Sequence, residues 1–212
     1  MCLEMAGAEA ARPYVEAARP THPSLVDERH QMDALFGVTN VPQVVWIDEA
    51  GTIVRGPEHG SVMPVGEDAA TMVERIGGME QRERYVAKLR DWAAKGARSE
   101  HVLTSDEVIA RSHPQPLAVS EAAAHFELAQ HLWRADGLSE RAIAHFNAAH
   151  ERQPDNITYK RQAYSALGMV RSGGDERGRF WQSPREGDEW PFVSDFTRDM
   201  EAMRAQRGAA RD

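Results

Sequence analysis

The feature that most constrains the fold is a run of β-branched and aromatic residues, followed by a turn and a second such run. Residues 44–47 read Val-Val-Trp-Ile, which is typical of a strand buried on both faces. Residues 48–51, Asp-Glu-Ala-Gly, predict a tight turn, and residues 52–54, Thr-Ile-Val, predict a return strand. Pro42 stands just before the first strand, where its missing N–H does not interrupt the ladder. The pattern therefore predicts a β-hairpin.

The segments before this hairpin alternate between strand and helix patterns. Residues 1–5 are short and apolar and predict a strand, and the alanine-rich residues 8–18 predict a helix. A second strand is expected at residues 24–27 and a second helix at residues 28–37, which ends at Gly37. Strand, helix, strand, helix and then a hairpin is an α/β order.

This order resembles the C-terminal half of a thioredoxin fold, most closely the TlpA/ResA type of thiol–disulfide oxidoreductase. In that family a helix leads into a Gly-Val turn, here Gly37-Val38, and a cis-proline, here Pro42, precedes a strand ending in Ile-Asp. The resemblance covers residues 1–96. It implies that Val41 and Pro42 bind the backbone of an extended substrate like an added strand. An ordinary trans-proline that opens a strand is the alternative.

Cys2 is the only cysteine, so the chain contains no Cys-x-x-Cys pair. Thiol–disulfide exchange needs an attacking thiol of lowered pKa and a second thiol that resolves the mixed disulfide. The resemblance implies a redox pair upstream of residues 1–5, as in ResA-like proteins whose first redox position is selenocysteine, and the sequence would then begin inside the fold. A second alignment makes Cys2 the resolving thiol at the start of a redox helix. Cys2 could also act as a single reactive thiol at a helix N-terminus beside Pro42, where Glu4 would oppose a lowered pKa.

Helical patterns dominate the rest of the chain. Residues 69–76 and 78–96 predict two helices, the second with Trp92 at a core or interface position. Residues 97–118 are polar and include His-Pro-Gln-Pro, which indicates a linker.

Residues 119–154 resemble one tetratricopeptide repeat, in which small residues stand where two helices touch and aromatics fill the gaps. Gln130 departs from this frame, which usually has Gly there, and Ala129 stands where Leu is usual. Residues 156–169 resemble the first helix of a following repeat. One repeat cannot bury its face alone, so we expect it to pack on the thioredoxin-like part, on the Trp92 helix or on another copy. A generic amphipathic hairpin is the alternative. The matching positions are Ala123, Phe126, Ala129, Trp133, Gly137, Ala142, Ile143, Phe146, Ala149 and Pro154.

Clustered aromatics mark the C-terminal extension. Phe180-Trp181 and Trp190-Pro191-Phe192 either wrap over the repeat or anchor a partner. Because exposed aromatics of this density are costly to leave in water, the pattern favours wrapping.

Charge and composition argue against several partners. The chain has 25 Lys and Arg against 33 Asp and Glu, a formal net charge of −8, which disfavours nucleic acid or an anionic membrane as the main partner. No stretch approaches the roughly 20 apolar residues of a membrane span. No signal peptide is visible, which predicts a cytoplasmic location, or an extracytoplasmic one if the sequence begins inside the fold. The nine histidines lack ligand-like spacing, so neither a metal nor a cofactor is predicted.

The predicted fold is an α/β thioredoxin-like domain, incomplete at its N-terminus, followed by an α-helical tetratricopeptide-like module. The predicted bounds are 1–96 for the first domain, 97–118 for the linker, 119–170 for the helices and 171–212 for the aromatic extension. The predicted function is that of a thiol–disulfide oxidoreductase family member without its Cys or Sec redox pair, with a protein substrate or redox partner. The alternative is a redox-silent scaffold that binds proteins through the repeat, and a homo-oligomer is compatible with either.

Overall fold

The computed structural model describes residues 1–60, 78–112, 115–167, 184, 187, 189–195, 198–199 and 201. The chain divides into two compact units: residues 1–35 with 115–212, the helical unit, and residues 36–114, the hairpin unit. This division differs from the predicted bounds, because the first 35 residues group with the C-terminal helices and not with the β-hairpin.

The helical unit opens with strands β1 (Cys2–Leu3) and β2 (Val26–Asp27), which pair in parallel across helix α1 (Ala8–Ala18). Helix α2 (Gln31–Phe36) follows at the boundary between the units. The carboxylate of Asp27 accepts hydrogen bonds from the first two backbone N–H groups of α2, at 3.1 Å and 2.7 Å. Such a capping carboxylate satisfies N–H groups that have no partner within the helix.

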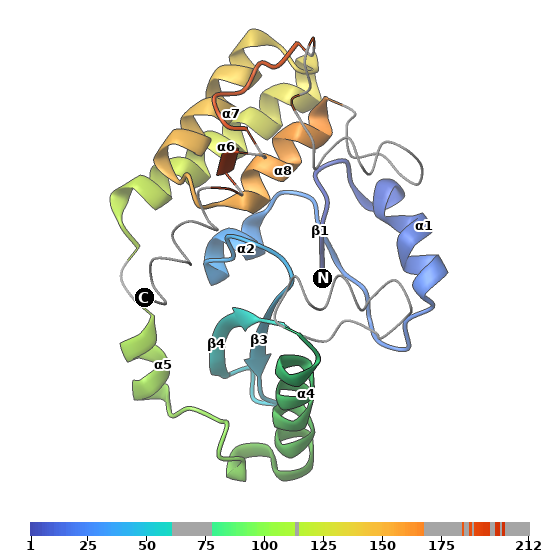
Figure 1. The fold of residues 1–212 in the computed structure, drawn as a ribbon, viewed down its shortest axis with the longest axis vertical. Helices are drawn as coiled ribbons and strands as arrows, with labels where there is room; N and C mark the ends of the chain where they lie inside the picture. Colours follow the sequence, from blue (N-terminus) through green and yellow to red (C-terminus); the bar gives the residue numbers. More distant parts are fainter. Residues whose placement is uncertain are drawn as a thin grey trace. The chain divides into compact units, whose positions relative to one another are not determined.

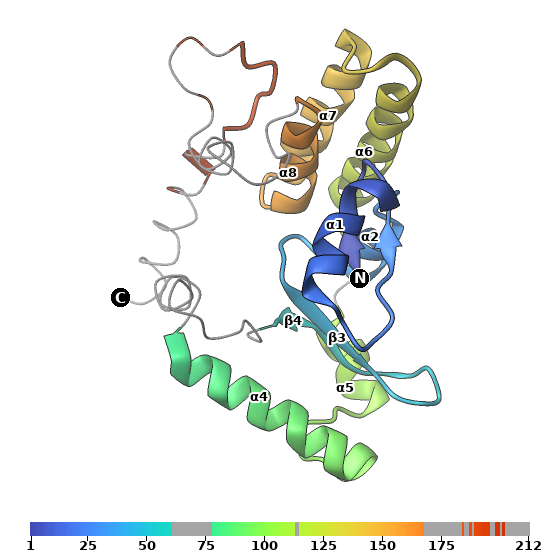
Figure 2. The ribbon, with the colours of Figure 1, turned by 90° about the vertical axis from the view of Figure 1, so that its right-hand side faces the viewer.

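Three further helices of this unit follow the hairpin unit in the sequence. Helices α6 (Leu117–Asp136) and α7 (Glu140–Arg152) form an antiparallel pair joined by a short turn, and α8 (Ile157–Ala166) packs beside α7 (Figures 1 and 2). The turn passes through Gly137 at φ +69°, a backbone conformation that favours glycine. Ser139 caps α7 and Asn156 caps α8 with their side chains, so local sequence signals set both starts.

The core of the helical unit lies between these helices. Phe126 packs its ring against Tyr159 in a stacked arrangement at 4.1 Å and against Phe146 edge-on at 5.7 Å. Ala129, Ala142 and Ala149, which the sequence places at helix contacts, are fully buried, whereas Ala123 is only partly buried. The buried cluster comprises Met5, Ala122, Phe126, Ala129, Leu132, Ala142, Phe146, Ala149, Ile157, Tyr159, Ala163, Tyr164 and Phe192.

The hairpin unit contains strands β3 (Gln43–Ile47) and β4 (Ile53–His59), which pair antiparallel as the sequence predicts. Asp48 fixes the turn, because its Oδ1 accepts from the N–H groups of Ala50 at 3.0 Å and Thr52 at 2.8 Å. Gly51 completes the turn at φ +82°.

Helix α4 (Gly78–Lys95) covers the hairpin in this unit (Figure 2). Trp92, which is partly buried, stacks on the buried Trp46 at 4.7 Å. The indole N–H of Trp46 donates to the hydroxyl of Tyr85 at 3.3 Å. The helix predicted at residues 69–76 lies outside the described residues.

The stretch predicted as a linker contains two helical elements, η1 (Gly96–Arg98) and α5 (Ser105–Arg111). Helix α5 begins with a capping box, in which Thr104 and Glu107 each bond the other's backbone N–H. The Thr-x-x-Glu pattern is present in the sequence. The helix was not predicted because its seven residues are too few to show an apolar periodicity. Among the described residues, none of the helices combines the length and apolarity needed to cross a membrane.

Candidate functional site

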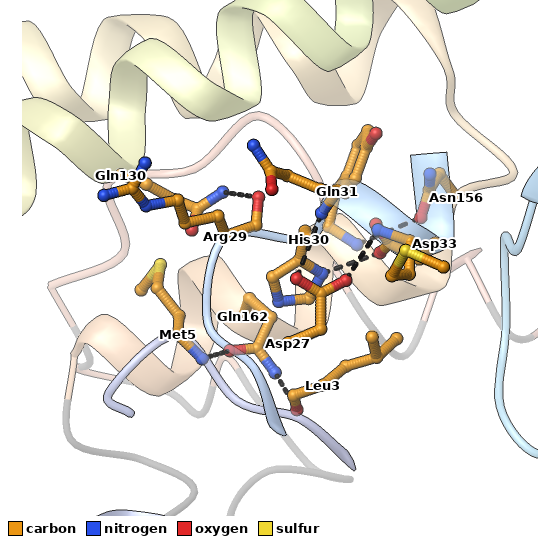
Figure 3. A network of polar contacts seen from close by, with 12 residues as sticks. Leu3, Met5, Asp27, Arg29, His30, Gln31, Asp33, Gln130, Asn156 and Gln162 are labelled. Atoms are coloured by element: carbon orange, nitrogen blue, oxygen red, sulfur yellow. Dashed lines mark hydrogen bonds and ion pairs between the residues drawn. The ribbon is translucent and has the colours of Figure 1, made fainter. Parts of the chain in front are cut away.

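Gln162 on α8 holds the first strand of the helical unit through its side-chain amide. Its Nε2 donates to the carbonyl oxygen of Leu3 at 3.2 Å, and its Oε1 accepts from the N–H of Met5 at 3.0 Å (Figure 3). One amide therefore joins the C=O of one residue and the N–H of the residue two positions later, as a residue of an adjacent parallel strand would.

Asn147 on α7 makes the same arrangement with the C-terminal segment. Its Nδ2 donates to the carbonyl oxygen of Pro191 at 3.1 Å, and its Oδ1 accepts from the N–H of Val193 at 2.9 Å. At two places, therefore, a side-chain amide on a helix bonds the carbonyl oxygen of residue i and the N–H of residue i+2 in another segment. This use of side-chain amides depends little on the sequence of the bound segment, because it contacts main-chain atoms alone.

Residues 189–195, the tail segment, are non-helical and lie against α7 and α8; this segment is red in Figure 1. Trp190, Phe192 and Ser194 point inward at alternate positions, whereas Val193 is 50% exposed. The indole N–H of Trp190 donates to the carbonyl oxygen of Ser194 at 2.7 Å and closes a bend. The predicted wrapping of the C-terminal aromatics is confirmed for Trp190 and Phe192. Phe180 and Trp181 lie outside the described residues.

A chain of buried polar groups anchors the end of this segment. The hydroxyl of Ser194 lies 2.6 Å from the hydroxyl of Tyr164 and 2.8 Å from Nδ1 of His150. Burial, together with the nearby charge of Lys160, lowers the pKa of His150 to about 3. His150 is therefore a neutral hydrogen-bonding group near pH 7 and not a cation. Burial also raises the pKa of Tyr164, so its phenol is protonated.

Lys160 on α8 binds the chain just beyond the tail segment. Its ammonium group, almost fully buried, pairs with Asp199 at 2.7 Å and donates to the carbonyl oxygen of Pro154. A buried charge needs such partners, because its desolvation is expensive.

The corner between β2 and α2 carries a second buried polar cluster (Figure 3). Nδ1 of His30 lies 2.6 Å from Oδ2 of Asp33, with both side chains only 1% exposed. Burial raises the pKa of Asp33, and the hydrogen bond from His30 partly offsets this effect. His30 adopts φ +56° and packs its ring edge-on against Phe126 at 5.1 Å. The ring contact of His30 with Phe126 joins the corner to α6.

Gln130, which stands where a tetratricopeptide repeat usually has Gly, uses its side-chain amide for tertiary contacts. Its Nε2 donates to the carbonyl oxygen of Arg29 at 3.4 Å (Figure 3). Its Oε1 accepts from Arg134 at 3.2 Å. Arg134 in turn donates to the carbonyl oxygen of Glu28 at 2.6 Å. These bonds tie α6 to the β2–α2 corner, which is why residues 1–35 belong to the helical unit.

Two histidines meet on the α6–α7 pair. Nδ1 of His125 lies 2.9 Å from Nδ1 of His145, and the rings stack at 5.1 Å. One nitrogen donates and the other accepts, so the contact holds when at most one ring carries two protons. Desolvation, Arg152 and the partner ring lower the pKa of His125, and Glu121 opposes them.

The structure places Cys2 in strand β1 and not at the start of a helix. Burial raises the pKa of its thiol, and the charge of Glu4 raises it further, which is the opposition expected from the sequence. Cys2 therefore does not stand at the start of a helix among the described residues, and neither a helix terminus nor its surroundings lower the pKa of the thiol. A redox role for Cys2 stays a prediction. Reactive cysteines have lowered pKa values, whereas the pKa of Cys2 is raised.

Val41 and Pro42 belong to the hairpin unit, whereas Cys2 belongs to the helical unit. The Val41–Pro42 peptide bond is cis, as the resemblance implies. Val41 is 39% exposed, and its N–H donates to Oδ1 of Asn40 at 2.8 Å. The carbonyl oxygen of Pro42 accepts from the N–H of Gly60 at 3.1 Å. The backbone that was predicted to bind substrate is thus partly engaged within the chain.

No sequence pattern indicated a role for Asn147, Gln162, His150 or Ser194. Each gains its role from a tertiary contact, and the only local signal was that its side chain can form hydrogen bonds. Among the residues that the structure describes, no three His, Cys, Asp or Glu side chains gather to hold a metal ion.

Comparison with known proteins adds no relative. No model of a known protein family matches the chain, and neither a curated protein nor a solved structure matches it. The thioredoxin-like and tetratricopeptide-like assignments stay predictions from sequence pattern.

Proposed function

We propose that the protein is an interaction module whose helices α7 and α8 bind an extended segment of a partner protein. The observation that supports this is the repeated amide arrangement: Asn147 and Gln162 each join a carbonyl and an N–H two residues apart. Two independent segments held in the same way indicate a surface suited to extended backbone. The module acts without redox chemistry of its own in this proposal, because burial raises the pKa of the single thiol.

A peptide array tests this function. Heptapeptides of varied sequence are probed with the full chain and with Asn147→Ala, and Glu127→Ala serves as a control because Glu127 is exposed on α6. We expect a subset of peptides to bind the wild-type chain and the control, and to lose binding to Asn147→Ala. If no peptide binds the chain, or if Asn147→Ala binds as well as the wild type, the proposed function is wrong.

The second candidate is thiol–disulfide exchange. The order of a parallel β1–α1–β2 unit, helix α2 and an antiparallel hairpin favours it, since this is the order that the resemblance implies. With one cysteine, the chain would need a thiol from another molecule to complete a cycle. Reduction of insulin by dithiothreitol, measured with the wild-type chain and with Cys2→Ser, tests this candidate. Acceleration by the wild type that Cys2→Ser lacks would support it.

A further inference from the structure

We propose that the tail segment is an internal ligand, and that its site accepts partner segments of the pattern aromatic-x-Phe-x-Ser in its place. The inference rests on the proposed function and names the ligand class of the same site. Trp190, Phe192 and Ser194 supply the three inward groups, and the positions between them face outward or are bound through backbone alone.

The pocket for the central Phe is built by rings of α7 and α8. Phe192 is 6% exposed, and its ring centroid lies 6.2 Å from Phe146, 5.8 Å from His150 and 5.5 Å from Tyr164. A pocket lined by aromatic rings at these distances favours another ring, because edge-on and tilted pairs contribute beyond burial. A smaller side chain would leave a cavity.

The position of Ser194 selects a hydroxyl. Its oxygen stands between His150 and Tyr164, in a buried place where His150 is neutral. Alanine there would leave Nδ1 of His150 without the hydroxyl that it contacts, and an unmet buried polar group is costly. Aspartate would bring a charge into the same buried place. A site that reads a hydroxyl in this way discriminates strongly against segments that lack it.

Trp190 adds a ring that lies 4.8 Å from Tyr164 and 5.7 Å from Phe192. Its indole N–H donates to the carbonyl oxygen of Ser194, so the segment is bent where it is bound. All these contacts come from residues 190–194 and the helices, and none requires that the segment be joined to this particular chain. A partner segment must therefore displace the tail segment, whose effective concentration is raised by its attachment.

Fluorescence anisotropy with a labelled heptapeptide tests the inference. The probe is Glu-Trp-Pro-Phe-Val-Ser-Asp, the sequence of residues 189–195, titrated with the full chain and with Phe192→Ala. Phe192→Ala weakens the internal ligand and opens the pocket, so we expect it to bind the probe at least tenfold more tightly than the wild type. Probes with Ala for Phe, or Asp for Ser, should lose binding by tenfold or more. Adding Asn147→Ala to Phe192→Ala should also reduce binding.

Two further measurements test whether the variant folds and whether copies exchange their tail segments. Circular dichroism verifies the fold of Phe192→Ala, and Ser194→Ala, which retains the shape of the segment, serves as a milder variant if the first fails to fold. A folded variant that binds the probe no more tightly than the wild type overturns the inference, while array binders dependent on Asn147 would leave the proposed function standing. Light scattering on the same samples detects exchange of tail segments between copies. A dimer formed in this way would make a second copy the occupant and overturn the partner proposal.

Discussion

The hydroxyl oxygen of Ser194 lies 2.8 Å from Nδ1 of His150, a contact that joins the tail segment to α7 across 44 residues of sequence. The docked segment helps to bury the imidazole, and burial opposes its charged form. The docked tail segment and the protonation of His150 are therefore linked, and the linkage has a definite sign.

Acid should destabilise the protein through His150. Its pKa is lowered to about 3 in the folded chain, whereas an unfolded histidine titrates near 6.5. The unfolded state then binds more protons as the pH falls from about 6.5 towards 3, and the free energy of unfolding falls by about 1.4 kcal/mol per pH unit from this group. Urea unfolding at pH 7, 6 and 5 measures the slope.

His150→Gln removes this titration and is the matched control. We expect it to be less stable than the wild type at pH 7 and to lose less stability between pH 6.5 and 5. His125 acts in the same direction and is present in both proteins, so the difference between the two slopes reports His150 alone. Parallel pH profiles would show that His150 does not titrate as described.

Phe126→Ala should cause a large loss of stability. The ring is 1% exposed and contacts His30, Phe146 and Tyr159, so its removal leaves a cavity that helices cannot readily close. The expected cost is about 3–5 kcal/mol in the free energy of unfolding. Leu128→Ala, at an exposed site of the same helix, should change it by less than about 0.5 kcal/mol. Chemical denaturation of both variants checks this difference.

Gln162→Ala should release strand β1. The change leaves the carbonyl of Leu3 and the N–H of Met5 without the amide that bonds them, and we expect a loss of about 1–3 kcal/mol. Gln162→Glu keeps an acceptor for Met5 but places a buried carboxylate opposite the carbonyl oxygen of Leu3, so its cost should be at least as large. Hydrogen exchange of the Met5 amide is the direct measurement, and unchanged protection would contradict the contact.

The thiol of Cys2 should react slowly with a disulfide reagent. Burial and Glu4 raise its pKa, so a smaller fraction is thiolate at a given pH than in a free cysteine. Reaction with dithionitrobenzoate at pH 8 should be slower than that of glutathione and should accelerate in urea. A rate for the native protein above that of glutathione would indicate an activated thiol and would support thiol–disulfide exchange as the function.

Thr104→Ala should loosen helix α5. The hydroxyl of Thr104 accepts from the N–H of Glu107 at 3.3 Å, and its loss removes one half of the capping box. Amide exchange in α5 should accelerate by a factor of about five. Asp106→Asn, in the same turn but outside the box, is the control and should change exchange less.

Much of the secondary structure could be predicted because its causes are local. The helix expected at residues 8–18 has those bounds, and the strands on either side of Asp48 pair as the hairpin pattern required. Spacing of apolar residues, a turn-forming side chain and caps act within a few residues of one another. Helix α5 was not predicted, because a capping box alone, without a longer apolar periodicity, does not identify a helix of seven residues.

The sequence by itself determined where helices and strands form and which rings are available for the core. Only the tertiary structure decided that residues 1–35 belong with the helices, and that Asn147 and Gln162 hold distant backbone. The amide of Gln162 meets Met5 across 157 residues, and no periodicity encodes such a pairing. A polar side chain gains its role from the atoms that burial brings beside it, and those atoms are set by packing of the whole unit.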